Sequence, residues 1–150
     1  MRNFENPDSM DSILGQICHL HHSRAHQLLE VLGLYRGQPP VLSALWEQEG
    51  PTQKELAEKL QNTPATITKM LQRMEKAGFI QRKPDEIDRR VTRVYLTRAG
   101  RTVKGNLEAI WKQMESETFQ GFTGQELEEL RGYMLRMRAN LLRFEEGAAG

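Results

Sequence analysis

The chain has 150 residues, of which 38% are hydrophobic and 27% charged, and its formal net charge is +1. This length suits one domain with its own core, and no apolar run approaches the ~20 residues that a membrane span requires. Because Met1–Ser12 lacks a signal-peptide pattern and Cys18 is the single cysteine, we expect a cytoplasmic protein without an internal disulfide.

Charge is distributed unevenly along the sequence. Residues 51–105 hold thirteen Lys or Arg and six acidic residues, whereas the two flanking segments are acidic. A basic section between acidic ends is expected when that section faces a polyanion. A helical surface that is only solvated would carry the two signs more evenly, so this distribution favours nucleic-acid binding.

Two helices are predicted at the start of the chain. Apolar residues recur at spacings of three and four over residues 9–32, which indicates a helix, and Gly33 is suited to end it. Pro39 and Pro40 fit the first turn of a second helix, which should end before Glu49.

Two shorter helices with a tight junction are predicted next. Thr52 and Glu55 form a capping box that begins a helix over residues 53–60. Thr63 is suited to cap the following helix, which should continue to about Ala77. So short a junction between two helices predicts a helix-turn-helix.

A β-hairpin is predicted after these helices. Residues 79–83 and 92–96 are rich in β-branched and aromatic side chains, and the charged segment 84–90 joins them. A helix-turn-helix followed by a hairpin is a winged helix. We therefore expect a mainly helical fold with one small β-hairpin.

The last part of the sequence predicts two more helices. Thr97 can cap the first, and Thr123 with Glu126 forms a capping box for the second. The apolar stripes of the first and last helices are too long for one small lobe to cover, which predicts a homodimer. We expect one domain over residues 1–150, with a winged helix-turn-helix lobe at 39–97 and dimerisation helices at 9–35 and 98–144.

One side of the helix beginning at Thr63 is apolar, and the other is polar and basic. Near its N-terminus, small residues would allow close approach to the major groove, where Lys69 and Gln72 can read base edges. The threonine hydroxyls can meet phosphates. An ordinary solvated helix would present a similar face. The candidate DNA-binding residues are Thr63, Ala65, Thr66, Thr68, Lys69, Gln72, Arg73 and Lys76.

The loop of the hairpin strengthens the DNA-binding interpretation. Arg89 and Arg90 can reach an adjacent minor groove, whose negative potential attracts arginine. Asp88 is unsuited to a phosphate contact. We therefore expect Asp88 to hold an arginine or to cap the loop through backbone N–H groups.

The chain resembles the MarR family of regulators in segments between Gly33 and Arg101. These segments are Gly33-Leu34, Gln38, Thr52–Ala57, Thr66–Thr68, Met74–Arg82, Asp88–Arg90 and Leu96–Gly100. The resemblance implies a homodimer with interlocked terminal helices and two winged lobes on one palindromic double-stranded DNA site. It also implies that Arg90 enters the minor groove and that Asp88 is its acidic partner. In many members, a small anionic or phenolic ligand bound between the dimerisation helices and the DNA lobe releases the repressor.

Cys18 lies among four histidines of the first helix: His19, His21, His22 and His26. A neighbouring histidinium could make the thiol more reactive, so Cys18 is a possible redox sensor, as in the hydroperoxide-sensing branch of the family. That branch activates its cysteine with tyrosines, whereas this chain has a histidine, His22, at one of the corresponding positions. Cys18 could also bind a metal with His19, His22 and His26, but the family's zinc sensors take further ligands from helices that lack histidine here. We favour burial of Cys18 and His21 at the dimer interface, without metal or cofactor.

Other classes of function receive less support. The sequence contains no nucleophile–base pair, phosphate-binding glycine loop or metal signature, so we do not expect an enzyme. A winged helix can instead serve protein association. That use predicts an acidic or apolar recognition face, whereas this one is basic and polar. The sequence therefore predicts a DNA-binding repressor, with a redox- or metal-responsive regulator as the alternative.

Overall fold

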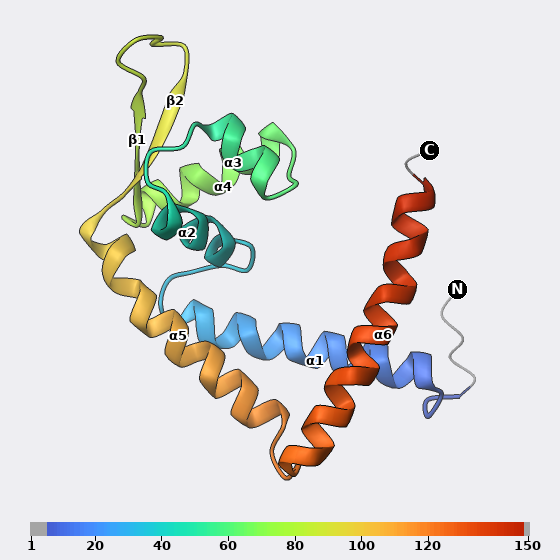
Figure 1. Ribbon diagram of the computed structural model, residues 1–150. Coiled ribbons are helices and arrows are strands. Elements are labelled where there is room, and N and C mark those ends of the chain that lie inside the picture. Colours follow the sequence, from blue (N-terminus) through green and yellow to red (C-terminus); the bar gives the residue numbers. More distant parts are fainter. Residues whose placement is uncertain (1–5, 149–150) are drawn as a thin grey trace. The chain divides into compact units, whose positions relative to one another are not determined.

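The computed structural model describes residues 6–148, which contain six helices and one two-stranded antiparallel sheet (Figure 1). In chain order the elements are α1 (Met10–Glu30), α2 (Gln38–Glu47), α3 (Gln53–Lys59), α4 (Pro64–Lys76), β1 (Ile80–Pro84), β2 (Thr92–Leu96), α5 (Arg98–Thr118) and α6 (Gly124–Ala148). The chain divides into two compact units, Met1–Met114 and Glu115–Gly150. Across residues 6–148, no helix combines the length and apolar character needed to cross a membrane.

The helix-turn-helix forms where its caps predicted. The Thr52 hydroxyl accepts a hydrogen bond from the Glu55 N–H at 3.1 Å, and the Glu55 carboxylate accepts one from the Thr52 N–H at 2.8 Å. Gln61 has a left-handed φ of 51° in the turn, and the Thr63 hydroxyl accepts from the Thr66 N–H at 3.2 Å. These local bonds set where α3 and α4 begin, so the prediction is confirmed.

The hairpin of β1 and β2 is also confirmed, with β1 displaced by one residue. Ile80 pairs with Leu96 and Pro84 with Thr92. Before β1, Gly78 has a φ of +89°, a left-handed conformation that favours glycine and ends α4. Phe79 therefore lies in the connection, where it is buried, and the strand begins at Ile80.

The core of the first unit lies between α2, α3, α4, the hairpin and α5. Its fully buried side chains include Leu29, Leu34, Val41, Leu42, Leu45, Leu56, Ile67, Leu71, Met74, Ile80, Val94 and Leu107. In α1, Ala25 and Leu29 are buried, whereas the earlier apolar residues Met10, Ile13, Leu14, Ile17 and Leu20 are exposed. The N-terminal half of α1 thus keeps an uncovered apolar surface.

Three hydrogen bonds join residues at and just after the end of α2 to the end of β2 and the start of α5. The Trp46 indole N–H donates to the Gly100 carbonyl oxygen at 2.9 Å. The Glu49 carboxylate accepts from the Leu96 N–H at 3.0 Å and from the Arg101 guanidinium at 2.6 Å. As predicted, Thr97 caps α5, because its hydroxyl accepts from the Gly100 N–H at 3.1 Å. The strand β2 therefore passes into α5 through a fixed junction.

The second unit contains α6, which the predicted capping box begins. The Thr123 hydroxyl accepts from the Glu126 N–H at 3.2 Å, and the Glu126 carboxylate accepts from the Thr123 N–H at 2.8 Å. The helix continues beyond the predicted boundary at Phe144 to Ala148. In the single chain its apolar residues Leu127, Tyr133, Met134, Leu135, Met137, Leu141, Leu142 and Phe144 are exposed.

Candidate nucleic-acid interface

The helix α4 has one buried apolar face and one exposed polar face, as its sequence predicts. Ile67, Leu71 and Met74 are fully buried, and Met70 packs against the same core. On the other side the side chains are exposed, apart from the half-buried Thr68. These outward residues form the recognition face, which consists of Thr63, Ala65, Thr66, Thr68, Lys69, Gln72, Arg73 and Lys76.

The threonines of the recognition face differ in their hydrogen bonds. The Thr63 hydroxyl donates to the Thr66 hydroxyl at 2.9 Å while it caps the helix. The Thr66 hydroxyl therefore keeps its own proton for an external acceptor. The Thr68 hydroxyl donates to the Pro64 carbonyl oxygen at 2.8 Å and accepts from the Gln53 amide at 3.4 Å. Thr68 thus connects α3 with α4, a role that the sequence did not reveal.

Four longer polar side chains of the recognition face remain available. Lys69, Gln72, Arg73 and Lys76 are exposed and form no side-chain hydrogen bond or ion pair with any residue from 6 to 148. They add three positive charges and one amide to the outer surface of α4. Such a surface can bind phosphates and read base edges.

Arg82, a basic residue near α4, stabilises the contact between α4 and β1. The Glu75 carboxylate accepts from the Arg82 backbone N–H at 2.8 Å and from the Arg82 Nε at 3.2 Å. These bonds attach the end of α4 to β1. The hydrogen bond from the Arg82 side chain is the main reason why the pKa of the Glu75 carboxyl lies below its ordinary value. Arg82 is therefore committed to this pair.

The loop between the strands, residues 85–91, is named here the wing tip, and its two arginines are exposed. Asp88 holds Arg90: one carboxylate oxygen accepts from Arg90 Nε at 3.0 Å and the other from Nη2 at 3.1 Å. These bonds lower the pKa of the Asp88 carboxyl. The expectation that Asp88 holds an arginine is therefore confirmed. Arg89 makes no hydrogen bond or ion pair within residues 6–148.

The backbone of the wing tip is capped by Asp85, which the sequence analysis did not single out. Its carboxylate accepts from the Ile87 N–H at 3.1 Å and the Asp88 N–H at 2.9 Å. It also accepts from Arg93 Nε at 2.5 Å. The Asp88 N–H and then Arg93 lower the pKa of Asp85 to about 2. An acid two and three residues before the N–H groups that it caps is the local signal that could have identified it.

The metal-binding alternative for the cysteine and histidines of α1 finds no support within residues 6–148. No group of three or more His, Cys, Asp or Glu residues from 6 to 148 is close enough to hold a metal ion. Cys18 and His21 are exposed in the single chain, so their burial at a dimer interface stays a prediction. His22 contacts Arg36, with 3.1 Å between Nε2 and Nη2.

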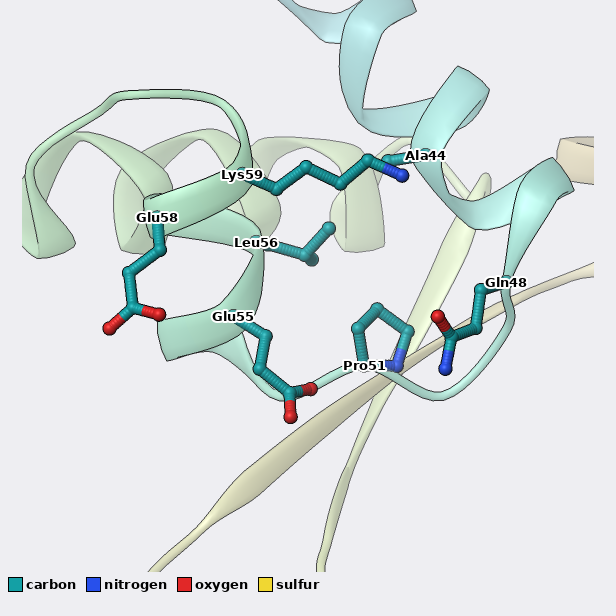
Figure 2. A pocket seen from close by; sticks show the side chains of 7 residues that line it. All are labelled: Ala44, Gln48, Pro51, Glu55, Leu56, Glu58 and Lys59. Carbon is teal, nitrogen blue, oxygen red and sulfur yellow. The ribbon is translucent and has the colours of Figure 1, made fainter.

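Two pockets lie next to α2. The first, of about 380 Å³, is lined by Ala44, Gln48, Pro51, Glu55, Leu56, Glu58 and Lys59 (Figure 2). The cation of this pocket, Lys59, is paired with Glu47 at 2.6 Å, which lowers the pKa of the Glu47 carboxyl. The second, of about 440 Å³, is lined by Pro39, Pro40, Ser43, Ala44, Trp46, Glu47, Lys59, Leu60, Leu107 and Trp111. It is the more aromatic of the two and includes residues of α2 and α5.

Comparison with known proteins gives a consistent family. The MarR family model matches residues 34–92, which include α2, the helix-turn-helix and β1. The chain is 33% identical over 137 residues to the HTH-type transcriptional regulator TtmR of Methylorubrum extorquens, covering 87% of this chain and 66% of that protein. It is 34% identical over 107 residues to the organic hydroperoxide resistance transcriptional regulator of Bacillus subtilis, covering 67% of this chain and 73% of that protein.

A solved structure extends the similarity to almost the whole chain. The crystal structure of the S. aureus MepR–DNA complex has a TM-score of 0.68 with this chain at 25% identity. The similarity covers 91% of this chain and 99% of that one. With the fold, the exposed polar face of α4 and the Asp88–Arg90 pair, these findings show that the chain belongs to the MarR family of winged helix-turn-helix transcription regulators.

Proposed function

We propose that the protein is a homodimeric repressor that binds a palindromic double-stranded DNA site through α4 and the wing tip. The observation that carries the proposal is the recognition face, whose cations have no partner among residues 6–148, in the same unit as the exposed Arg90. In a winged helix, such a helix enters the major groove while the wing reaches the neighbouring minor groove.

The proposal assigns different roles to the residues of the recognition face. Lys69 and Gln72 read base edges, because they lie in the part of α4 that enters the groove first. Lys76 lies a turn further along, where it contacts phosphate. The free hydroxyl proton of Thr66 and the backbone N–H groups at the start of α4 bind phosphate oxygens.

The uncovered apolar surfaces of α1 and α6 support a dimer. Among the residues of α6 whose side chains are described, none is buried in the single chain, and Met134 and Leu141 are 51% and 65% exposed. Apolar surfaces this extensive are typical of the interfaces of obligate dimers. The two protomers would then each supply one winged lobe, and each lobe would bind one half of the DNA site.

A small anionic or phenolic effector is proposed for the pocket that Trp46 and Trp111 line. Its apolar and aromatic lining suits a planar ring, and an acidic group on that ring would compete with Glu47 for Lys59. Because the lining includes residues of α2 and α5, a ligand there would change how these helices pack. Benzoate and phenol are suitable probes: either should quench tryptophan fluorescence in the wild type, and the response should fall in Trp111→Phe.

The DNA-binding proposal is tested by selection. The purified chain would be incubated with duplexes carrying about 30 random base pairs, enough for two half-sites one helical turn apart. Bound duplexes should become enriched in inverted repeats and should bind more tightly than the starting pool. A promoter–reporter assay with the selected site then tests whether the protein represses. Equal affinity for selected and unselected duplexes would contradict the proposal.

Oxidation of Cys18 is a second candidate for the control of DNA binding. Its thiol is exposed in the single chain, and one relative is named as an organic hydroperoxide resistance regulator. The thiolate would attack a hydroperoxide oxygen, the O–O bond would break, and a sulfenic acid and an alcohol would form after proton transfer. Cumene hydroperoxide should then release the selected duplex from the wild type but not from Cys18→Ser. Release from both proteins would exclude this candidate.

The same proposal places the protein in the cytoplasm, where its DNA site is accessible, and gives it no enzymatic activity. The membership in a family of transcription regulators supports both statements.

A further inference from the structure

We propose that Asp85 and Arg93 are positioning residues that fix the wing tip, so that Arg90 is already oriented when DNA binds. The inference rests on the proposed DNA-binding function and deepens it, because neither side chain is among the proposed DNA contacts. Their hydrogen bonds form a continuous series from the segment before α3 to the arginine of the wing tip.

The series begins beside β2. The Gly50 N–H donates to the Val94 carbonyl oxygen at 3.0 Å, and the Val94 N–H donates to the Pro51 carbonyl oxygen at 3.0 Å. Thr52 and Arg93 form a backbone bridge. The segment that leads into the helix-turn-helix therefore extends the hairpin along one edge of β2, and this edge provides a fixed base for the wing.

Arg93 connects this base with the loop. Its Nη1 donates to the Gly50 carbonyl oxygen at 2.8 Å, and its Nε donates to the Asp85 carboxylate at 2.5 Å. The planar guanidinium can hold both acceptors at once, which a lysine ammonium on its flexible stem does less well. The Asp85 side chain is only 16% exposed, so this charge-assisted pair is partly shielded from water.

Asp85 connects Arg93 with the residues of the wing tip that hold Arg90. Its second carboxylate oxygen accepts from the Ile87 and Asp88 N–H groups, and Asp88 in turn holds Arg90. The Asp85 N–H donates to the Val91 carbonyl oxygen at 2.8 Å, which closes the loop. A two-stranded hairpin alone is marginally stable in water, so these bonds reduce the disorder that DNA binding would otherwise have to remove.

The charge of Asp85 makes the inference testable by the sign of an effect. Removing an acid near bound DNA should strengthen binding if only long-range electrostatics matter. Loss of the positioning series should weaken it. Glu86 is a matched control, because it is a neighbouring exposed acid whose side chain forms no hydrogen bond or ion pair within residues 6–148.

The experiment compares Asp85→Ala with Glu86→Ala on the duplex selected by the wild type. Glu86→Ala should bind as well as the wild type or slightly more tightly. Asp85→Ala should bind about tenfold more weakly, near the lower part of the loss expected for Arg90→Ala. Arg93→Lys, which keeps the charge, should also bind more weakly. Equal or tighter binding by both Asp85→Ala and Arg93→Lys would overturn the inference.

Two further measurements separate positioning from a general loss of structure. In the Arg90→Ala background, Asp85→Ala should have little additional effect, because the residue that it positions is gone. In the free protein, the Ile87 and Asp88 amides should exchange their hydrogens faster in Asp85→Ala, while amides of α4 stay unchanged. Full additivity of the two substitutions, or unchanged exchange at the tip, would contradict the series.

Failure of the inference is distinguishable from failure of the proposed function. If the wild type binds a selected duplex and Arg90→Ala weakens it, but Asp85→Ala does not, the positioning role alone is wrong. If the wild type selects no duplex, the DNA-binding proposal is wrong, and the role of the pair in DNA binding falls with it.

Discussion

The backbone carbonyl oxygen of Phe79 lies 2.1 Å from the position that a Cβ atom would occupy on Gly100. No side chain can be accommodated at that distance without a shift of the backbone. The contact allows the first turn of α5 to pack directly against the connection between α4 and β1. Gly100 is therefore required by this close approach, whereas its φ lies outside the left-handed region.

Replacing Gly100 with alanine should lower the free energy of unfolding by about 1–3 kcal/mol, the cost that is typical of an overpacked core. Gly105→Ala is the matched control, because Gly105 also lies in α5 and an added Cβ meets nothing within 4 Å. There the removal of glycine from a helix should stabilise by about 0.5–1 kcal/mol. Urea denaturation at one fixed chain concentration measures both. A neutral Gly100→Ala would contradict the packing argument.

The proposed minor-groove contact predicts a specific loss. Arg90→Ala should weaken binding to the selected duplex by about 1–3 kcal/mol, because the arginine that would enter the minor groove is removed. The oligomeric state should not change, since Arg90 is 90% exposed and lies in the wing tip. Gel shift and sedimentation measure the two properties. Unchanged affinity at moderate salt would refute the contact.

Gln72 and Lys76 lie on one face of α4 but should behave differently. Lys76→Ala should weaken binding to selected and random duplexes alike and reduce the slope of log affinity against log salt by about one unit. Gln72→Ala should instead lower the ratio of selected to random affinity and leave the slope nearly unchanged. If neither substitution changed that ratio, α4 would contact only the DNA backbone.

The apolar surface of α6 predicts an obligate homodimer. Sedimentation should show a dimer at micromolar chain concentration. Leu141→Lys should disrupt it, because a lysine would be buried in the interface without a partner. Ala139→Lys adds the same charge to the opposite side of α6 and should leave the dimer intact. A folded wild-type monomer under these conditions would rule out the obligate interface.

The low pKa of Asp85 predicts how its contribution to stability depends on pH. In the unfolded chain the carboxyl titrates near its ordinary value of 3.8, and in the folded chain at about 2. The stabilisation is therefore complete above the unfolded value and is lost as the pH falls through the folded value. The difference in stability between the wild type and Asp85→Asn should be constant from pH 7 to about 5 and should shrink below pH 4. A difference that grows on acidification would show that other groups dominate.

Local signals in the sequence were sufficient for most of the fold. The capping boxes at Thr52 and Thr123 and the cap at Thr63 gave the starts of three helices, because each depends on residues within one helical turn. The strand β1 was displaced by one residue, since periodicity does not reveal that Phe79 is buried in a connection. The exposed and buried faces of α4 followed from its 3.6-residue period.

The parts that could not be predicted depend on contacts between residues distant in the sequence. The choice of Arg93 as the partner of Asp85 and of the Gly50 carbonyl oxygen depends on how the hairpin meets the segment before α3. Likewise, the contact of Thr68 with Gln53 follows from the packing of two helices. Cys18 is exposed in the single chain, so its predicted burial would require contacts with a second chain.

The junction formed by Trp46, Glu49, Leu96, Gly100 and Arg101 limits how the proposed regulator can change shape. Because the end of α2 is bonded to the start of α5 on both sides of Thr97, a bend at that point would break several hydrogen bonds together. The winged lobe and the first turns of α5 should therefore move together as one rigid body. An effector that alters the spacing of two lobes would have to flex α5 further along or act through α1, and the hinge should be sought there.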